Sequence, residues 1–375
     1  MNSGVSIQFP LFDETHSCRI FEQQYSQIYF VRLNQLRQSI LESFLSSTTS
    51  TSPTHTQCRL LDLKLDVPSF VVGTIYIDLP KKPNVLSELS TQLNINSSFP
   101  QYFGNDIPAY GDDNAFARNI FAEDESGRIQ ITFSENVKLR SFVTSGMVLG
   151  LTGRQAKIEK KPLFVVDSIY FASSFDNLTP VFALPNIKKK ISSNDIVIAC
   201  SLFSSFESEN FLSLQKMFSF LQMEEMNTPN RVIIAGNICA LDSQADADTA
   251  CFISDLDNFI YEYLVDTNKS VILIPGSNDP TSISLPQRPI VRGLFEKSSS
   301  LLKSQFELTT NPSYLTLDGK KVLVVSGQNI DDMARYYAKR ASHSENLDEG
   351  QLRLILAQIT LVSRHIAPTA PDTLC

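Results

Sequence analysis

Apolar residues recur every three or four positions between Phe21 and Leu45, which is the spacing of one face of an α-helix. Since an apolar helix face usually finds cover within its own chain, we expect this helix to pack on the chain's own second domain and not on a partner. The next segment, Ser46 to Thr56, is poor in apolar residues and contains Pro53, so it predicts a linker. The apolar face comprises Phe21, Tyr25, Ile28, Tyr29, Leu33, Leu36, Ile40 and Phe44.

Beyond the linker the pattern changes to short apolar or alternating runs, divided by turn residues such as Gly127, Gly153 and Pro162. Such runs predict β-strands, and a short helical candidate from Glu135 to Phe142 falls between two of them. This order and spacing predict a small Greek-key barrel of the oligonucleotide-binding (OB) type. The predicted strands are Phe70 to Ile77, Arg128 to Phe133, Met147 to Leu151 and Leu163 to Phe171.

Aromatic side chains exposed on such a barrel could stack on the bases of a single strand, and Tyr76, Phe133 and Tyr170 are the candidates. Aromatic residues at period two are more often part of the core, and the acidic run Glu123-Asp124-Glu125 would repel a phosphate backbone. A net charge of −8 also disfavours a protein whose main work is to hold phosphates. A freestanding single-strand-binding barrel is therefore a minor alternative, which a salt-dependent binding titration tests.

From about Asp195 onward, strands of the buried type alternate with helical segments. Alternation of strand and helix predicts parallel strand pairs and a layered α/β domain. In an open sheet of this kind, ligands bind at the carboxyl ends of the strands. The predicted strands are Ile196 to Ala199, Val232 to Ala235, Val271 to Ile274 and Val322 to Val325, and the predicted helices are Phe211 to Met223 and Phe252 to Leu264.

The whole chain bounds the class of protein. Its 375 residues predict two domains with an extension. The six cysteines form no Cys-x-x-Cys pair, which excludes a zinc knuckle or a thioredoxin-type motif, and we expect them to be reduced. No basic-then-apolar leader opens the chain and no apolar run is long enough to span a bilayer, so we expect a soluble cytosolic or nuclear protein without membrane partners.

The segments that follow the α/β strands resemble the motifs of metallophosphoesterases, but the metal-binding residue types are replaced. Asp-x-His after the first strand, Gly-Asp after the second, Gly-Asn-His-Asp after the third and a His-Gly pair after the fourth would be expected. A dinuclear site needs carboxylate and imidazole donors at these positions, and none of the four histidines, His16, His55, His343 and His365, follows one of these strands. The residues standing in the ligand positions are Ser201, Phe203, Asn237, Ser277, Asn278 and Ser326.

Asn237 is expected to hydrogen-bond backbone groups at a βα turn. Asp279 keeps its identity, although in the resembled motif it orients the histidine that is missing here. His365 lies in a proline-rich segment and is expected to be a hydrogen-bonded structural group. A working phosphoesterase with atypical ligands is the second alternative, which a metal analysis of the purified protein tests.

Several further segments resemble the B subunits of eukaryotic DNA polymerases, and the Ser-Gly-Gln-Asn-x-Asp-Asp and Pro-Thr-Ala-Pro-Asp-Thr-Leu segments favour the delta branch. The resemblance covers nearly the whole chain. It implies an N-terminal helix and linker (1–55), an OB-fold domain (56–185) and an inactive calcineurin-like metallophosphoesterase α/β sandwich (186–375). Archaeal relatives keep the metal ligands and act as exonucleases. The segments are Phe21 to Tyr25, Val71 to Thr74, Leu285 to Pro289, Thr310 to Pro312, Leu317 to Gly319, Ser326 to Asp332 and Arg364 to Leu374.

The resemblance implies a nuclear, non-catalytic scaffold without a cofactor or a metal. Its implied partners are the cysteine-rich C-terminal domain of the DNA polymerase delta catalytic subunit and the third polymerase delta subunit, with DNA reached through the complex. The candidate contact residues are of types enriched at interface hot spots, and we expect them in exposed loops of the phosphoesterase-like domain: Arg288, Arg292, Arg335 and Tyr336.

The resembled family continues beyond the Pro-Thr-Ala-Pro-Asp-Thr-Leu segment with a Gly-Cys-Tyr-Pro-Phe stretch and further strands. The sequence therefore leads us to expect a truncated or spliced form whose sheet exposes an unpaired edge or an uncovered face.

Overall fold

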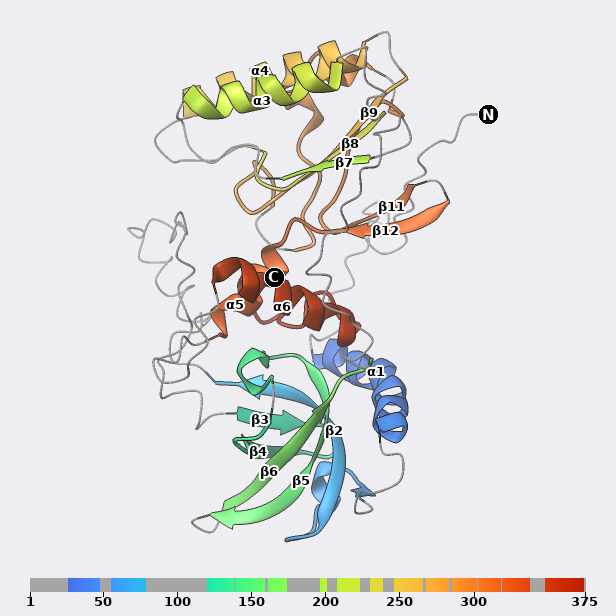
Figure 1. The fold of residues 1–375 in the computed structure, drawn as a ribbon, viewed down its shortest axis with the longest axis vertical. Helices are drawn as coiled ribbons and strands as arrows, with labels where there is room; N and C mark the ends of the chain where they lie inside the picture. The colour runs from blue at the N-terminus through green and yellow to red at the C-terminus, as the bar shows by residue number, and fades with distance from the viewer. Residues whose placement is uncertain are drawn as a thin grey trace. The chain divides into compact units, whose positions relative to one another are not determined.

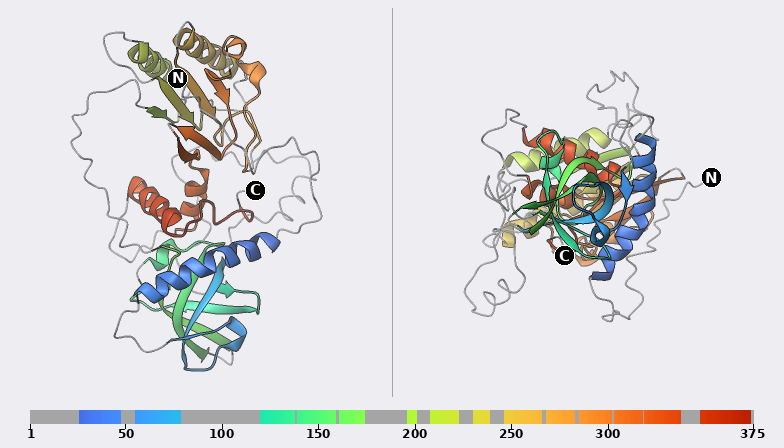
Figure 2. Two further views of the ribbon diagram at one scale, coloured as in Figure 1. Left: turned by 90° about the vertical axis from the view of Figure 1, so that its right-hand side faces the viewer. Right: turned by 90° about the horizontal axis from the view of Figure 1, so that it is seen from below.

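The structure is a computed structural model, and it forms two compact units that we describe separately (Figures 1 and 2). The barrel unit joins Ile20–Phe182 with Asn329–Leu374, and the α/β unit is Ala183–Gln328 together with Met1–Arg19 and Cys375. The described residues are 26–47, 55–78, 120–137, 139–158, 161–173, 196–200, 208–222, 230–238, 246–265, 268–282, 285–301, 303–317, 319–337 and 348–373.

The strands of the barrel unit curl into a closed sheet, as the sequence predicted (Figure 1). The order β1-β2-β3-β4-β6-β5 is closed by pairing of β2 with β5. Two 3₁₀ turns, Leu60–Asp62 and Arg140–Phe142, interrupt the strands. The strands are β1 (Thr56–Gln57), β2 (Pro68–Ile77), β3 (Ile120–Glu123), β4 (Arg128–Phe133), β5 (Val148–Ile158) and β6 (Lys161–Tyr170).

Two details of the barrel differ from expectation. The helix predicted from Glu135 to Phe142 is reduced to the 3₁₀ turn Arg140–Phe142, which begins after Leu139 with a φ of 67°. A left-handed residue cannot continue an α-helix, so the helical pattern is broken there. Strand β3 was not predicted, because four residues are too short to show a clear alternation.

Helix α1 (Ser26–Ser47) packs on the barrel, so its cover is within this chain as expected. Leu33, Ile40 and Phe44 are buried in one cluster with barrel residues, and the Phe44 ring stacks on Phe70 with centroids 4.0 Å apart. The prediction that Ile28 belongs to the buried apolar face was wrong, because its side chain is 43% exposed. Phe21 and Tyr25 lie outside the described residues.

Helices α5 (Gln328–Arg335) and α6 (Glu349–Val362) also belong to the barrel core. Asp348 begins α6 with a capping box, in which its side chain accepts a hydrogen bond from the Gln351 backbone N–H at 2.8 Å. The predicted domain 186–375 is therefore divided, because its C-terminal part, Asn329–Leu374, belongs to the barrel unit. Met333, Tyr336, Leu356, Ile359 and Val362 share one buried cluster with Ile75, Met147 and Phe164.

The α/β unit contains a parallel sheet in the order β10-β9-β8-β7. Helices α3 (Ser208–Gln222) and α4 (Asp246–Leu264) cover one face of the sheet (Figure 1), where Val232, Ile234, Val271 and Leu273 join the helix residues in one core. The strands are β7 (Ile196–Ala199), β8 (Arg231–Ala235), β9 (Ser270–Ile274) and β10 (Phe306–Leu308).

The opposite face of this sheet is covered by an antiparallel hairpin of β11 (Ser313–Leu317) and β12 (Lys320–Val324). Leu315 and Leu317 pack there on Ile272 and Ile274. The prediction that Val322 to Val325 continues the parallel sheet was therefore wrong, since β12 pairs only with β11 among the described strands. The fourth parallel strand is instead β10, whose three residues gave no pattern. None of the described helices is long and apolar enough to cross a membrane.

Candidate functional site

The segments that follow β8 and β9 meet at the carboxyl edge of the parallel sheet. Asn237, after β8, has a φ of 49°, and its side-chain Oδ1 accepts hydrogen bonds from Ser277 Oγ and from the Asn278 backbone N–H, both at 3.3 Å. A Cβ on Gly276 would lie 2.4 Å from the Asn237 backbone nitrogen, so the two turns need glycine to approach this closely. The expectation that Asn237 binds backbone at a turn is confirmed.

Asp279 closes the turn after β9. Its carboxylate is 3% exposed and accepts a hydrogen bond from the Gly276 backbone N–H at 2.7 Å. Gln287 holds the same turn from the other side, because its side-chain Nε2 donates to the carbonyls of Gly276 and Ser282, both at 2.9 Å. The carboxylate therefore acts on its own loop, as a short-range turn cap.

Ser326, which follows the β11–β12 hairpin, joins this edge through Asn311. Asn311 Nδ2 donates to Ser326 Oγ at 2.7 Å and to Gln287 Oε1 at 2.8 Å, while the Ser326 backbone N–H donates to Asn311 Oδ1 at 3.3 Å. Gln328 Nε2 is the second donor to Gln287 Oε1, at 3.1 Å. We call Asn237, Ser277, Asn278, Gln287, Asn311, Ser326 and Gln328 the strand-end network.

The strand-end network contains only amides and hydroxyls. Amide and hydroxyl oxygens are weak donors for transition metals compared with carboxylate and imidazole. Within the described part of the chain, no group of three or more His, Cys, Asp and Glu side chains could hold a metal ion. Ser201 and Phe203, the two predicted positions after β7, lie outside the described residues.

Asn237, Ser277 and Asn278 follow parallel strands as the sequence predicted, whereas Ser326 follows the β11–β12 hairpin and not a parallel strand. The sequence did not indicate the roles of Gln287 and Asn311. The side chains of Gln287 and Asn311 are almost fully buried and hydrogen-bond to each other. The backbones of the same two residues also form an isolated antiparallel β-bridge. Both follow or precede a proline in segments rich in polar residues, which resemble ordinary loops. A long-range pair of amides has no periodicity that a sequence could show.

The four candidate partner-binding residues differ in exposure. Arg288 is exposed, and Arg292 is half-buried with its Nη2 3.4 Å from the Phe306 carbonyl. Arg335 is the last residue of α5 in the barrel unit, so the expectation that it lies in an exposed loop of the phosphoesterase-like domain was wrong. Its Nη1 is 3.9 Å from the buried carboxylate of Asp332. Tyr336 is only 1% exposed and belongs to the barrel core, so the expectation that it lies in an exposed loop was wrong. Its position directly after α5 turns the ring inward.

Two of the three aromatic residues considered for base stacking lie in the core, and one lies on the outward face of the barrel. Tyr170 lies edge-on to Phe44 at 5.2 Å beneath α1, and Phe133 packs against the barrel core, as expected for period-two aromatics. Tyr76 instead lies on the outward face of β2, where the Arg128 guanidinium is 4.6 Å from its ring centroid.

Arg32 of α1 joins three distant parts of the barrel unit. Its Nη1 donates to the Pro368 carbonyl at 2.9 Å and lies 3.4 Å from the Gly146 carbonyl, and its Nη2 donates to the Ala370 carbonyl at 2.7 Å. Arg32 is 8% exposed, so a buried charge fixes the C-terminal segment to α1 and to the barrel.

His365 lies in the segment held by Arg32. Burial, and then the charge of Arg32, lower the pKa of the His365 imidazole to about 3. Its backbone N–H donates to the Thr360 carbonyl at 3.1 Å, but its buried Nδ1 has no hydrogen-bond partner among the described residues. The expected hydrogen bond is thus not made at Nδ1, and the lowered pKa keeps the imidazole neutral.

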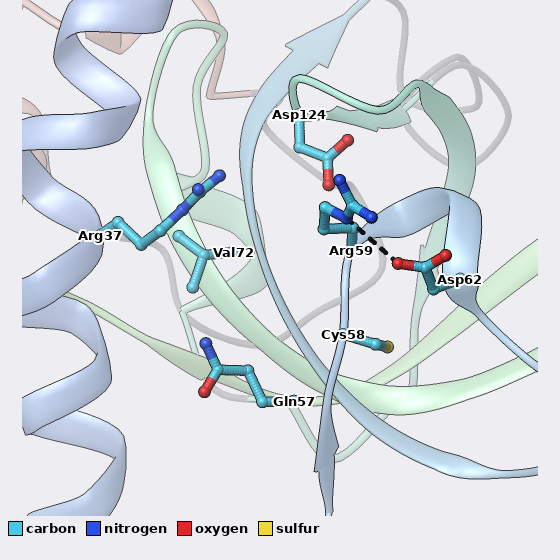
Figure 3. Close-up of a pocket in the computed structure, with 7 residues that line it drawn as sticks. All are labelled: Arg37, Gln57, Cys58, Arg59, Asp62, Val72 and Asp124. Atoms are coloured by element: carbon cyan, nitrogen blue, oxygen red, sulfur yellow. Dashed lines mark hydrogen bonds and ion pairs between the residues drawn. The ribbon is translucent and has the colours of Figure 1, made fainter.

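One pocket of the barrel unit, with a volume of about 280 Å³, lies beside α1 (Figure 3). Its charges are largely engaged, because Arg59 pairs with Asp62 at 3.1 Å and Asp124 accepts the Leu60 backbone N–H at 2.9 Å. Burial raises the pKa of the Cys58 thiol, which lowers its thiolate fraction and its reactivity. The lining is Arg37, Gln57, Cys58, Arg59, Asp62, Val72 and Asp124.

Comparison with known families matches the two parts of the chain separately. The family model "DNA polymerase delta subunit OB-fold domain" matches residues 24–169, and the family model of the DNA polymerase alpha/epsilon B subunits matches residues 196–375. The first range contains α1 and the barrel strands up to the last residue but one of β6, and the second contains the α/β elements with α5 and α6.

Similar proteins were found in yeast, plants and archaea. The DNA polymerase delta small subunit of Saccharomyces cerevisiae is 29% identical over 97% of this chain and 77% of its own length, and that of Oryza sativa subsp. japonica is 29% identical over 94% and 77%. The DNA polymerase II small subunit of Methanothermobacter thermautotrophicus is 32% identical, but over only 26% of this chain and 18% of its own length.

Proposed function

The chain belongs to the family of DNA polymerase B subunits, and we propose that it serves as the non-catalytic accessory subunit of a DNA polymerase delta in replication and repair synthesis. The observation that carries this proposal is the match to delta small subunits over 94% or more of the chain, across both family regions. A nuclear location follows from the same role.

For the α/β unit we propose the layout of a calcineurin-like phosphoesterase sandwich that has lost its catalysis. A parallel sheet with helices on one face and a β-hairpin on the other supports the layout. The strand-end network supports the loss, because neutral amides occupy the edge where such an enzyme needs carboxylates and imidazoles.

The proposed role is to link the cysteine-rich C-terminal domain of the catalytic subunit to the third subunit, with DNA reached through the complex. Arg288 and Arg292 of the α/β unit and Arg335 of the barrel unit stay candidate contacts, and Tyr336 is withdrawn because it is buried. Arg288 is the candidate best suited to a mutational test, since its side chain is exposed.

Co-expression with the delta catalytic and third subunits, followed by size exclusion, tests the assembly role. We expect the three proteins to elute together, and Arg288→Glu to weaken the complex by tenfold or more if Arg288 lies at the interface. Lys320→Glu is the matched control, because Lys320 is also an exposed cation of the α/β unit. Failure of the native chain to co-elute would contradict the proposed function. If Arg288→Glu leaves the complex unaffected, Arg288 lies outside the interface, and the proposed function stands.

Hydrolysis assays test the proposed loss of catalysis. We expect no turnover of phosphodiester substrates with Mn²⁺, Mg²⁺ or Zn²⁺, because the strand-end network offers no metal-activated nucleophile. Asn278→Ala is the diagnostic variant, since Asn278 stands in the position of the missing catalytic histidine. Turnover that survives repurification and is lost in Asn278→Ala would contradict the proposal.

A further inference from the structure

The strand register gathers a set of cations and aromatic rings on the outward face of the barrel. Tyr76, Phe121, Gln130 and Leu163 form one cross-strand row over β2, β3, β4 and β6. Their neighbours along each strand, such as Ile75, Ala122, Ile131 and Phe164, are buried, so the row faces outward.

Two further rows flank this one. Arg128 pairs with Glu123 across β4 and β3, and Lys161 begins β6 two positions before Leu163, so Lys161 lies beside Arg128. On the other side, Arg154 of β5 pairs with Val165 of β6. Arg128, Lys161 and Arg154 are all exposed, on three neighbouring strands about 5 Å apart.

The guanidinium of Arg128 lies over two aromatic rings of this face. The Arg128 guanidinium lies 3.9 Å from the Phe121 ring centroid and 4.6 Å from that of Tyr76. A guanidinium plane and an aromatic ring are both surfaces on which an unpaired base stacks, without preference for its sequence. The face therefore offers stacking groups and phosphate-binding cations together.

Two carboxylates of the acidic turn beside this face are bound to other groups. Glu125 pairs with Arg37 of α1, and this hydrogen bond lowers the pKa of its carboxyl. Asp124 accepts hydrogen bonds from the backbone N–H groups of Leu60, Ser126 and Gly127. Glu123 lies 3.2 Å from Arg128, and Asp167 of β6, two positions after Val165, is a second carboxylate exposed on this face. On the face itself, repulsion of phosphate therefore comes from Glu123 and Asp167, against the three cations Arg128, Lys161 and Arg154.

We propose that this outward face, defined by Phe121, Arg128, Arg154 and Lys161, binds single-stranded nucleic acid. The positive face contrasts with the net charge of −8 of the whole chain, so binding depends on local charge. Stacking favours a single strand over a duplex, whose bases are already stacked. The inference rests on the barrel register and not on the proposed function.

Fluorescence anisotropy of the full chain with a labelled oligothymidylate tests the proposal. Three phosphate contacts on a single strand predict a logarithmic salt slope of about −2, so affinity should fall by roughly 20-fold between 50 and 200 mM salt. Arg154→Ala/Lys161→Ala should weaken binding and reduce the slope by about 1.4, because two contacts are lost. Lys320→Ala/Lys321→Ala, on β12 of the α/β unit, removes the same charge and should change neither.

Two single variants separate the stacking and charge contributions. Glu123→Gln should tighten binding about threefold or more, since it frees Arg128 from its pair. Phe121→Leu should weaken binding with the salt slope unchanged. No binding at 50 mM salt, full binding by the Arg154→Ala/Lys161→Ala variant, or equal binding of polyglutamate would overturn the proposal. If the double variant fails to fold, the direction of the Glu123→Gln change decides.

Discussion

The two units of the molecule solve the burial of polar groups differently. In the barrel unit, the charge of Arg32 binds carbonyls more than 300 residues away in the sequence. In the α/β unit, the strand-end network joins its turns through neutral amides of Gln287 and Asn311. A charge gives stronger hydrogen bonds but a greater loss when its partner geometry is disturbed, whereas neutral amides give weaker and pH-independent bonds.

The largest expected effect comes from closing the space beside Arg32. In Gly146→Ala, the new Cβ would lie 1.8 Å from the Pro368 carbonyl oxygen, at a φ of 80°. We expect a loss of about 3–4 kcal/mol in the free energy of unfolding, measured by urea denaturation. Gly319→Ala is the matched control, because its φ is 79° and its Cβ would meet no atom within 4 Å. Equal losses for both variants would assign the effect to backbone strain alone.

Removing the charge itself should have the next largest effect. In Arg32→Met, the side chain keeps much of its apolar length, but the carbonyls of Pro368 and Ala370 lose a charged donor. We expect a loss of about 2–3 kcal/mol. The control is Arg37→Met on the same helix, which breaks a more exposed pair with Glu125 and should lose less than about 1 kcal/mol. Similar losses would show that the buried position of Arg32 adds nothing.

A carboxyl group placed in the strand-end network should lower the free energy of unfolding most at a pH where the group is ionised. In Asn311→Asp, the donors to Gln287 and Ser326 disappear, and a buried carboxylate that keeps only the Ser326 backbone N–H as a donor replaces the amide, so we expect a loss of about 2 kcal/mol at pH 7. Burial raises the folded-state pKa of such a carboxyl, so stability should recover as the pH falls toward about 4. Asn311→Ala is the control, and its loss should not vary with pH.

The smallest expected effect lies at the edge strand β10. Burial raises the pKa of the Glu307 carboxyl to about 7, above its value in the unfolded chain. The native chain therefore loses stability as the pH rises from about 4.5 to about 7. Glu307→Gln should be more stable than the native chain at pH 8, by roughly 1 kcal/mol after allowance for solvent screening of this partly exposed group, and equal to it at pH 4. A difference that persists at pH 4 would contradict this assignment.

The sequence predicted strands with a strong local pattern and failed where long-range pairing decides. The bounds of β4 and β7 were predicted to the residue, because each is a complete apolar or alternating run. The pairing of β12 could not be predicted, because a buried run has the same pattern whether its neighbour is parallel or antiparallel. Asn237 and Ser277 were placed by their motif, whereas Gln287 and Asn311 meet only after the chain has folded.

The barrel unit is interrupted in the sequence by the α/β unit, and this has a consequence for synthesis on the ribosome. The barrel core needs Met333, Leu356 and Val362, which are translated only after residues 183–328. At the usual rate of about 5–20 residues per second, the barrel strands wait roughly 10–35 s for these helices. During that time the apolar surface that α5 and α6 cover in the folded chain is exposed, so we expect chaperones to bind the nascent barrel before it is complete.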